Sequence, residues 1–226
     1  MSETPGATIR YTTDGTAPTT SNGTGYSAPL TIAAPDSKTA IVIRARSFAP
    51  GLLPSGTKTQ TYLVAQDSLL TTAPTLAITG DPRRDLFKPH GITAIEGGTY
   101  TDSNDNTLNA LWQASGPGDY NTPSGRGRAY ERETHLEYYF PPAFYTGSQE
   151  PYRGDVGIRL SSSPWSRPRL TLRSTHLSPW IRSEKEKPSF NLFWRGDFGS
   201  SKLDYPIFPG YSVSTFDNLR LRAGKN

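Results

Sequence analysis

The sequence predicts a mostly β protein. Glycine occurs 21 times and proline 20 times among the 226 residues, which interrupts the chain too often for long helices. Threonine, valine, isoleucine and tyrosine are frequent and favour strands. Aromatic residues make up 11% of the chain, and because each can bury a large area, folded cores are feasible although only 34% of the residues are hydrophobic. We expect short strands separated by turns, in one or two domains.

The first 64 residues alternate in the manner of short strands. The clearest segment lies at 39–47, where Ile41 and Ile43 point one way and Arg44 and Arg46 the other. The Asp-Gly pair that comes after the first of these segments is a tight-turn signal. Strands at this regular spacing are typical of a small immunoglobulin-like β-sandwich. The expected strands are 7–13, 26–32, 39–47 and 57–64.

The rest of the chain predicts a second β-rich unit, after a polar linker at 65–75. A short buried strand at 76–79 precedes a loop or short helix, and a strand is expected at 91–95. Residues 97–129 are rich in Gly, Asn, Asp, Ser and Pro, and we expect most of them to form a long surface loop. Further strands are expected at 134–140, 155–161, 168–174, 188–199 (ending in a turn) and 216–224.

The first segment resembles the chitobiase/β-hexosaminidase C-terminal-type domain. The resemblance rests on "TPGATIRYTTDGTAPTTSNGTGYSAPLTI" and "IRARSFAPGLLPSGTKTQTYLV". They contain the family's Tyr-Thr-x-Asp-Gly-x-x-Pro turn, a later Arg-Ala strand and a closing Ser-x-x-x-x-x-Tyr strand. The resemblance implies an immunoglobulin-like module at 1–64 that lacks the family's first strand, so that one sheet edge is unpaired.

The second segment, 76–226, resembles the opening part of the spore-coat protein H (CotH) kinase family. The resemblance rests on "LAITGDPRRDLFKPHGI", "HLEYYF", "GIRLSSSPWSRP", "KPSFNLFWRGDFGSSKLDYPIFPG" and "FDNLRLRAGKN", in this order. It implies the opening of an atypical kinase fold. In the family, a largely helical segment with the acidic catalytic and metal-binding residues comes after these motifs, so we expect this chain to be a truncated, non-catalytic part of a larger protein.

The resemblance implies one candidate nucleotide site. Family members often have glycines where this chain has Ser161, Ser162 and Ser163, and a Lys-Lys pair where it has Lys187-Pro188. A strand-loop-strand with a phosphate-binding lysine is what kinase chemistry needs on the nucleotide side. The alternatives are a plain hairpin with a polar turn and a solvated lysine. No catalytic and no metal-binding residues are assigned within the chain.

Two further patterns are less specific for a binding site than these motifs. Five aromatic residues could form a sugar-stacking platform, although most tryptophans in β domains pack in the core. The three histidines lack metal-ligand spacing, so each is interpreted as a structural or surface residue. The aromatic residues are Trp112, Tyr120, Trp165, Trp180 and Trp194, and the histidines are His90, His135 and His176.

Together these patterns predict a structural or interaction region of a large exported bacterial protein, ahead of a CotH-like phosphotransferase core. The alternative is a carbohydrate- or cell-surface-binding β module. The expected partners are other domains of the parent chain and a cell-surface protein or glycan. ATP and a divalent metal belong to the parent rather than to this part. The net charge of +4, the mixed charges and the lack of a long apolar run argue against nucleic acid and a membrane span. Secretion or the cell surface is expected, with any signal peptide upstream.

Overall fold

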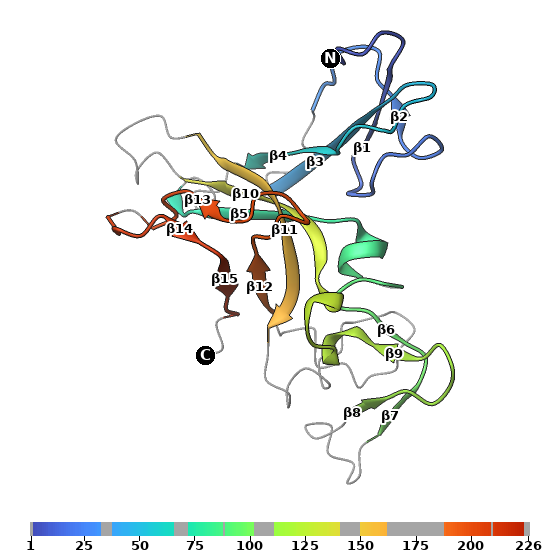
Figure 1. Ribbon diagram of the computed structural model, residues 1–226, viewed down its shortest axis with the longest axis vertical. Coiled ribbons are helices and arrows are strands. Elements are labelled where there is room, and N and C mark those ends of the chain that lie inside the picture. Colours follow the sequence, from blue (N-terminus) through green and yellow to red (C-terminus); the bar gives the residue numbers. More distant parts are fainter. Residues whose placement is uncertain are drawn as a thin grey trace. The chain divides into compact units, whose positions relative to one another are not determined.

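The computed structural model describes most of the chain (Figure 1). The described residues are 2–32, 38–65, 72–87, 89–101, 111–140, 150–161, 188–208 and 210–223. They belong to two compact units, each made of segments distant in sequence. The first consists of Met1–Asp81, His135–Gly154 and Ile207–Tyr211, and the second of Pro82–Thr134, Asp155–Pro206 and Ser212–Asn226.

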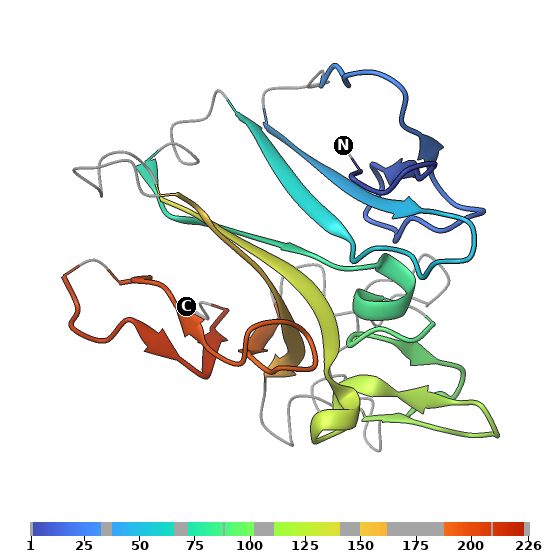
Figure 2. The same ribbon diagram turned by 45° about the horizontal axis from the view of Figure 1, so that its top comes forward.

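An antiparallel four-stranded sheet forms the N-terminal module in the first unit. Its strands are β1 (Thr8–Thr12), β2 (Thr24–Gly25), β3 (Lys38–Phe48) and β4 (Lys58–Ala65), in the order β2-β1-β3-β4. Figure 2 shows β3 and β4 as two long neighbouring strands. Their register runs from Lys38 opposite Ala65 to Ala45 opposite Lys58. Three of the four strands expected from the sequence are therefore confirmed.

The strand expected at 26–32 is wrong. Pairing with β1 occurs earlier, in β2, and ends where the Tyr26 amide donates to the carbonyl of Ile9 at 2.8 Å. Pro29 then removes a donor from the segment that was expected to continue the ladder. Gly23 shapes the turn into β2: its φ is +97°, and a Cβ there would lie 2.7 Å from the Tyr11 carbonyl oxygen.

Arg44, which was expected on the side of the strand opposite Ile41 and Ile43, has a defined structural role. The side chain is buried, and its Nη1 donates to the carbonyl of Gly15 at 2.8 Å. Gly15 belongs to the turn after β1, so the arginine holds that turn against β3. Strand alternation separates Arg44 from the isoleucines, but it does not show that the turn after β1 binds this side chain.

Two further strands are β5 (Thr75–Thr79), which belongs to the first unit, and β10 (Arg132–Tyr139), which belongs to it from His135 on. They pair antiparallel, with His135 opposite Thr79 and Tyr139 opposite Thr75. Leu136 and Tyr138 are both buried, as their shared face predicts. The Tyr138 hydroxyl donates to the carbonyl of Ile207 at 3.1 Å, which satisfies its polar end.

Glu137 of β10 is buried and binds the N-terminal module. One carboxylate oxygen, Oε2, accepts the Thr61 amide of β4 at 2.7 Å. The other, Oε1, lies 2.7 Å from the Tyr139 hydroxyl, 3.3 Å from Gln60 Nε2 and 3.4 Å from Arg153 Nε. The Tyr139 hydroxyl also lies 2.8 Å from the Thr61 carbonyl oxygen. Side chains of β10 therefore bind both backbone groups of Thr61, which lies opposite Val42 of β3 in the register.

The second unit contains three paired strands, with β12 (Ser189–Phe193) between β15 (Asn218–Leu221) and β11 (Tyr152–Ser161), which belongs to this unit from Asp155 on. β13 (Leu203–Asp204) pairs with β14 (Thr215–Phe216). Apolar side chains of these elements and of the segment at 92–95 form the buried core. Its members are Ile92, Ala94, Ile95, Val156, Ile158, Leu160, Leu192, Trp194 and Leu203.

Short elements fill the sequence between β5 and β10. A loop or a short helix was expected after β5, and the structure has a single helical turn there, η1 (Pro82–Leu86). The expected strand at 91–95 is mostly wrong: β6 comprises only Ile95–Glu96, and residues 91–94 form a buried turn closed by the Thr93 amide, which donates to the Leu86 carbonyl at 3.0 Å. A close fit holds this turn, because a Cβ on Gly91 would lie 2.2 Å from the Leu86 carbonyl carbon.

The region 97–129 was expected to be mostly a long loop, and its described residues instead carry several elements. β6 pairs with β9 (Tyr120–Asn121), and β7 (Thr99–Thr101) pairs with β8 (Leu111–Gln113). Two 3₁₀ turns come next, η2 (Thr122–Ser124) and η3 (Arg128–Tyr130). The polar composition predicted turns correctly but hid the short strands between them.

The mostly β fold class is confirmed, with several antiparallel sheets. The strands expected at 134–140, 155–161 and 188–193 are present, and β15 lies within 216–224 with Leu219 and Leu221 half-buried and Arg220 exposed between them. The strand expected at 168–174 and most of the linker at 65–75 lie outside the described residues. Within the described part, no helix is long and apolar enough to cross a membrane.

Candidate functional site

Of the four predicted nucleotide-site residues, the structure describes only Ser161. It is the last residue of β11, is buried, and lies opposite Ser189 in the register with β12. The Ser189 hydroxyl oxygen accepts the Ala223 amide at 2.9 Å. Ser162, Ser163 and Lys187 lie outside the described residues, so the nucleotide site remains a prediction.

The predicted aromatic platform is placed only in part. Trp194 is 3% exposed in the core of the second unit and is therefore not a platform residue. Tyr120 lines a pocket in the same unit. The side chains of Trp112, Trp165 and Trp180 lie outside the described part. Among the side chains that the structure describes, no cluster of three metal-ligating residues is present.

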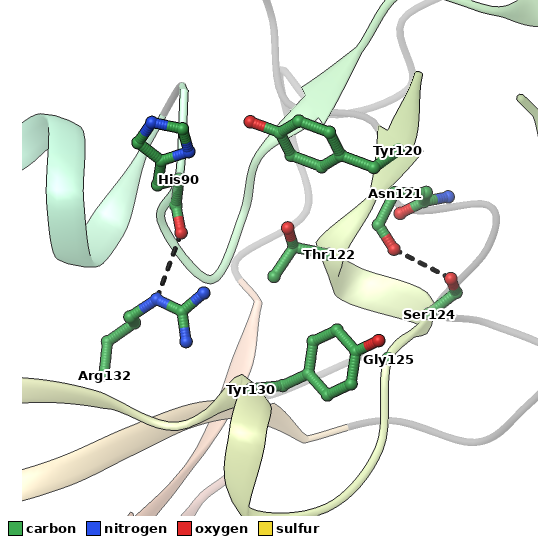
Figure 3. A pocket seen from close by; sticks show the side chains of 8 residues that line it. All are labelled: His90, Tyr120, Asn121, Thr122, Ser124, Gly125, Tyr130 and Arg132. Atoms are coloured by element: carbon green, nitrogen blue, oxygen red, sulfur yellow. Dashed lines mark hydrogen bonds between the residues drawn. The ribbon is translucent and has the colours of Figure 1, made fainter. Parts of the chain in front are cut away.

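The pocket in the second unit is polar and aromatic and has a volume of about 390 Å³. Its walls come from three places in the sequence: the end of the turn after η1, the β9–η2 segment, and the junction of η3 with β10. Figure 3 shows Tyr120 and Tyr130 on opposite sides of the pocket, with Thr122 between them. The lining residues are His90, Tyr120, Asn121, Thr122, Ser124, Gly125, Tyr130 and Arg132.

Arg132 is held rigidly at the edge of the pocket. Its Nε donates to the carbonyl of His90 at 3.1 Å (Figure 3), and its Nη1 donates to the carbonyls of Ala129 and Glu131, both at 2.9 Å. These bonds fix the plane of the guanidinium. No hydrogen bond of Nη2 is found in the described part of the chain, so this nitrogen is a fixed donor available to a ligand.

Tyr130 packs directly on Gly125. A Cβ on Gly125 would lie 2.2 Å from Cε1 of the Tyr130 ring, so any side chain there would displace the ring. The backbone of Gly125 is in the ordinary extended region, with φ −64° and ψ 151°, and glycine is therefore needed for space rather than for conformation. Tyr130 is still 38% exposed, so it lies at the rim rather than in the core.

A buried carboxylate anchors the segment that carries Tyr130 and Arg132. Glu131 is 6% exposed, and Arg195 binds it with two hydrogen bonds, from Nε at 2.8 Å and from Nη2 at 3.1 Å. Arg159 Nη1 lies 4.0 Å from the same carboxylate. The two hydrogen bonds to buried Glu131 fix the end of η3 and the start of β10, and the residues on either side of Glu131, Tyr130 and Arg132, both line the pocket.

Two of the residues that line the pocket carry a buried polar atom without a hydrogen-bond partner in the described part of the chain. The Tyr120 hydroxyl and the Asn121 Oδ1 are shielded from solvent, and neither forms a hydrogen bond within the residues that the structure describes. A buried polar group without a partner is costly and uncommon in folded proteins. Burial, with a smaller contribution from the charge of Glu96, raises the pKa of Tyr120, while Arg132 acts in the opposite direction. The hydroxyl is therefore neutral and able to donate at neutral pH.

The sequence patterns singled out only His90 and Tyr120 among the eight lining residues, and for other roles. Four of the remaining ones, Asn121, Thr122, Ser124 and Gly125, come from the region 97–129 that was expected to be mostly a loop, and Tyr130 and Arg132 lie between it and the strand expected at 134–140. One signal was present: in "AYER" at 129–132, an acidic residue stands between an aromatic and a basic one at strand spacing. At strand spacing Tyr130 and Arg132 would share a face, but Tyr130 ends the turn η3, and the pattern does not show that Glu131 is buried.

Comparison with known families identifies the N-terminal module. Residues 1–62 match the family model described as "Fn3 associated", which makes this module a fibronectin-III-associated, immunoglobulin-like type of β domain. The match covers 62 of the 226 residues and does not reach the pocket. The more specific chitobiase-type and CotH-type resemblances stay predictions. No curated protein and no solved structure matches the chain.

Proposed function

We propose that this chain is a structural and interaction region of a large exported protein, and that it precedes a CotH-like phosphotransferase core in that protein. The order and spacing of the motifs at 76–226 support the phosphotransferase assignment. The Fn3-associated module and the β-rich unit then position the core, and partners are other domains of the same protein and a cell-surface protein or glycan. ATP and a divalent metal bind the parent protein, with Ser161–Ser163 and Lys187 on the nucleotide side.

The observation that carries the structural role is the anchoring of the module by Glu137. The hydrogen bonds from β4 to Glu137 and Tyr139 join residues that are 76 and 78 positions apart in the chain. They connect a buried carboxylate to β4, which is an edge strand of its sheet. Backbone groups left unsatisfied on an edge strand are open to pairing with a strand of another chain. A module fixed in this way can hold the adjoining parts of the protein in a defined position, which is the task of a structural region.

The alternative of a carbohydrate- or surface-binding module rested on the aromatic platform. Burial of Trp194 removes one of the five residues from that platform. The platform therefore does not favour this alternative, and glycan recognition needs a different set of residues.

The experiment is paired calorimetry and phosphotransfer with ATP and Mg²⁺, on this chain and on the parent protein that contains it. We expect no turnover by this chain alone, because positioning and electrostatic stabilisation by carboxylate-bound metal supply nearly all of the catalysis in phosphoryl transfer. In the parent, Lys187→Ala should weaken ATP binding by about 1–3 kcal/mol if the lysine contacts phosphate. Lys58→Ala, at an exposed end of β4, is the matched control. Robust turnover by this chain alone would overturn the proposal.

A further inference from the structure

We propose that the pocket of the second unit binds one neutral sugar unit, a ring whose hydroxyl groups both donate and accept hydrogen bonds. The site lies outside the Fn3-associated module and outside the predicted nucleotide residues. It is independent of the phosphotransferase assignment and of the aromatic platform. The inference rests on the shape of the pocket and on the groups that its walls offer.

The walls suit a ring with an apolar face. Tyr120 and Tyr130 stand on opposite sides of the pocket (Figure 3), and aromatic faces pack well against the C–H groups of a sugar ring. Gly125 holds Tyr130 in place, since no other residue leaves room for its ring. The volume of about 390 Å³ is at the small end of the range for small-molecule pockets, about 300–1,000 Å³.

The polar groups need a ligand that both donates and accepts. Arg132 Nη2 offers donors only, whereas Asn121 Oδ1 accepts only. The Tyr120 hydroxyl can do either, and the Ser124 hydroxyl, which donates to the Asn121 carbonyl at 2.8 Å, keeps lone pairs that accept. Sugar hydroxyls match such a mixed set.

The orphaned groups also give the ligand a source of affinity. The Tyr120 hydroxyl and Asn121 Oδ1 are shielded from solvent in the free protein, so a ligand reaches them when the two side chains turn toward it. This rotation of the two side chains is favoured because the ligand supplies the hydrogen bonds that both groups lack.

An anionic ligand fits less well. Arg132 is the one permanently charged residue among those that line the pocket, and three of its hydrogen bonds already go to backbone carbonyls. A phosphate group offers mostly acceptors, so Asn121 Oδ1 would remain without a donor. The nearby charge of Glu96, which bears on Tyr120, further disfavours an anion. The chemistry of the walls therefore selects a neutral, hydroxyl-rich ring.

The test is a ¹H–¹⁵N chemical-shift titration of the whole chain with glucose, galactose, mannose and N-acetylglucosamine, and separately with inorganic phosphate. We expect at least one sugar to shift the amide signals of residues 120–125 and 130–132, with a dissociation constant of about 1 mM, as suits one small ring. Tyr130→Ala should weaken that binding about tenfold through loss of the ring face.

Two variants separate binding from folding. Tyr26→Ala is the matched control, because Tyr26 is 41% exposed and Tyr130 38% exposed, and it should leave sugar binding unchanged. Tyr120→Phe removes a hydroxyl that has no partner in the free protein, so it should weaken binding several-fold without lowering the thermal midpoint.

Three results would overturn the proposal: no shift with any of the four sugars, shifts with phosphate but with no sugar, or equal sugar binding by Tyr130→Ala and Tyr26→Ala.

Discussion

At the scale of single residues, the contacts of Tyr139 make a prediction about pH. Burial, together with the hydrogen bond and the negative charge of Glu137, raises the pKa of Tyr139 well above its ordinary value of 10.0. In the unfolded chain the phenol ionises near that ordinary value. The stabilising contribution of Tyr139 is therefore complete below pH 10.0 and is lost as the pH rises toward the raised pKa of the folded state.

The measurement is the free energy of unfolding by denaturant, at a series of pH values from neutral to strongly alkaline. We expect the wild-type chain to lose stability above pH 10.0 more steeply than Tyr139→Phe, which has no proton to lose at this position. Tyr62→Phe, at an exposed position of β4, should behave like the wild type. Equal alkaline slopes for Tyr139→Phe and the wild type would show that the raised pKa does not contribute to stability.

Residue patterns predicted one face of β10 but not the other. Alternation placed Leu136 and Tyr138 on a common face, and both are buried. By the same alternation Glu137 lies on the opposite face, which a single strand would leave to solvent. It is fully buried because the distant strand β4 supplies its partners, and no local pattern contains that information.

At the scale of elements, β11 depends on the absence of a side chain at Gly157. A Cβ there would lie 2.6 Å from Cε2 of Phe198 and 3.5 Å from Oε2 of Glu131. Gly157→Ala should therefore destabilise the chain by about 1–3 kcal/mol, as overpacking of a filled site does. Gly196→Ala is the control, because nothing lies within 4 Å of its Cβ position. Thermal and denaturant unfolding of the two variants measure the difference, and equal stabilities would contradict the packing described for β11.

Strands with β-branched or aromatic residues in alternation were predicted well, as β1, β3, β4, β10 and β12 show. The errors occur where the local chemistry conflicts with the alternation. The segment at 26–32 contains a proline, and the segment at 91–94 is closed by hydrogen bonds to η1 and to Phe87. Strands of two or three residues, such as β6 and β9, are too short to show a period at all.

At the scale of the whole molecule, the fold class could be predicted from composition, whereas the pocket could not. Its walls join His90, residues 120–125 and residues 130–132, which are brought together by turns and by the burial of Glu131. The polar groups of these segments look like ordinary loop residues along the chain. Only the three-dimensional arrangement shows that an arginine and two tyrosines line one cavity, and that Tyr120 and Asn121 of its lining carry polar atoms without partners among the described residues.

The central structural claim is that Glu137 anchors the Fn3-associated module through the backbone of Thr61. Amide hydrogen exchange of Thr61 tests it most directly, because this amide donates to the carboxylate. We predict protection in the wild type, exchange about 10–100-fold faster in Glu137→Ala, as the loss of a charge-assisted hydrogen bond implies, and no change in the exposed control Glu133→Ala. Rapid exchange of Thr61 in the wild type, or unchanged protection in Glu137→Ala, would contradict the claim.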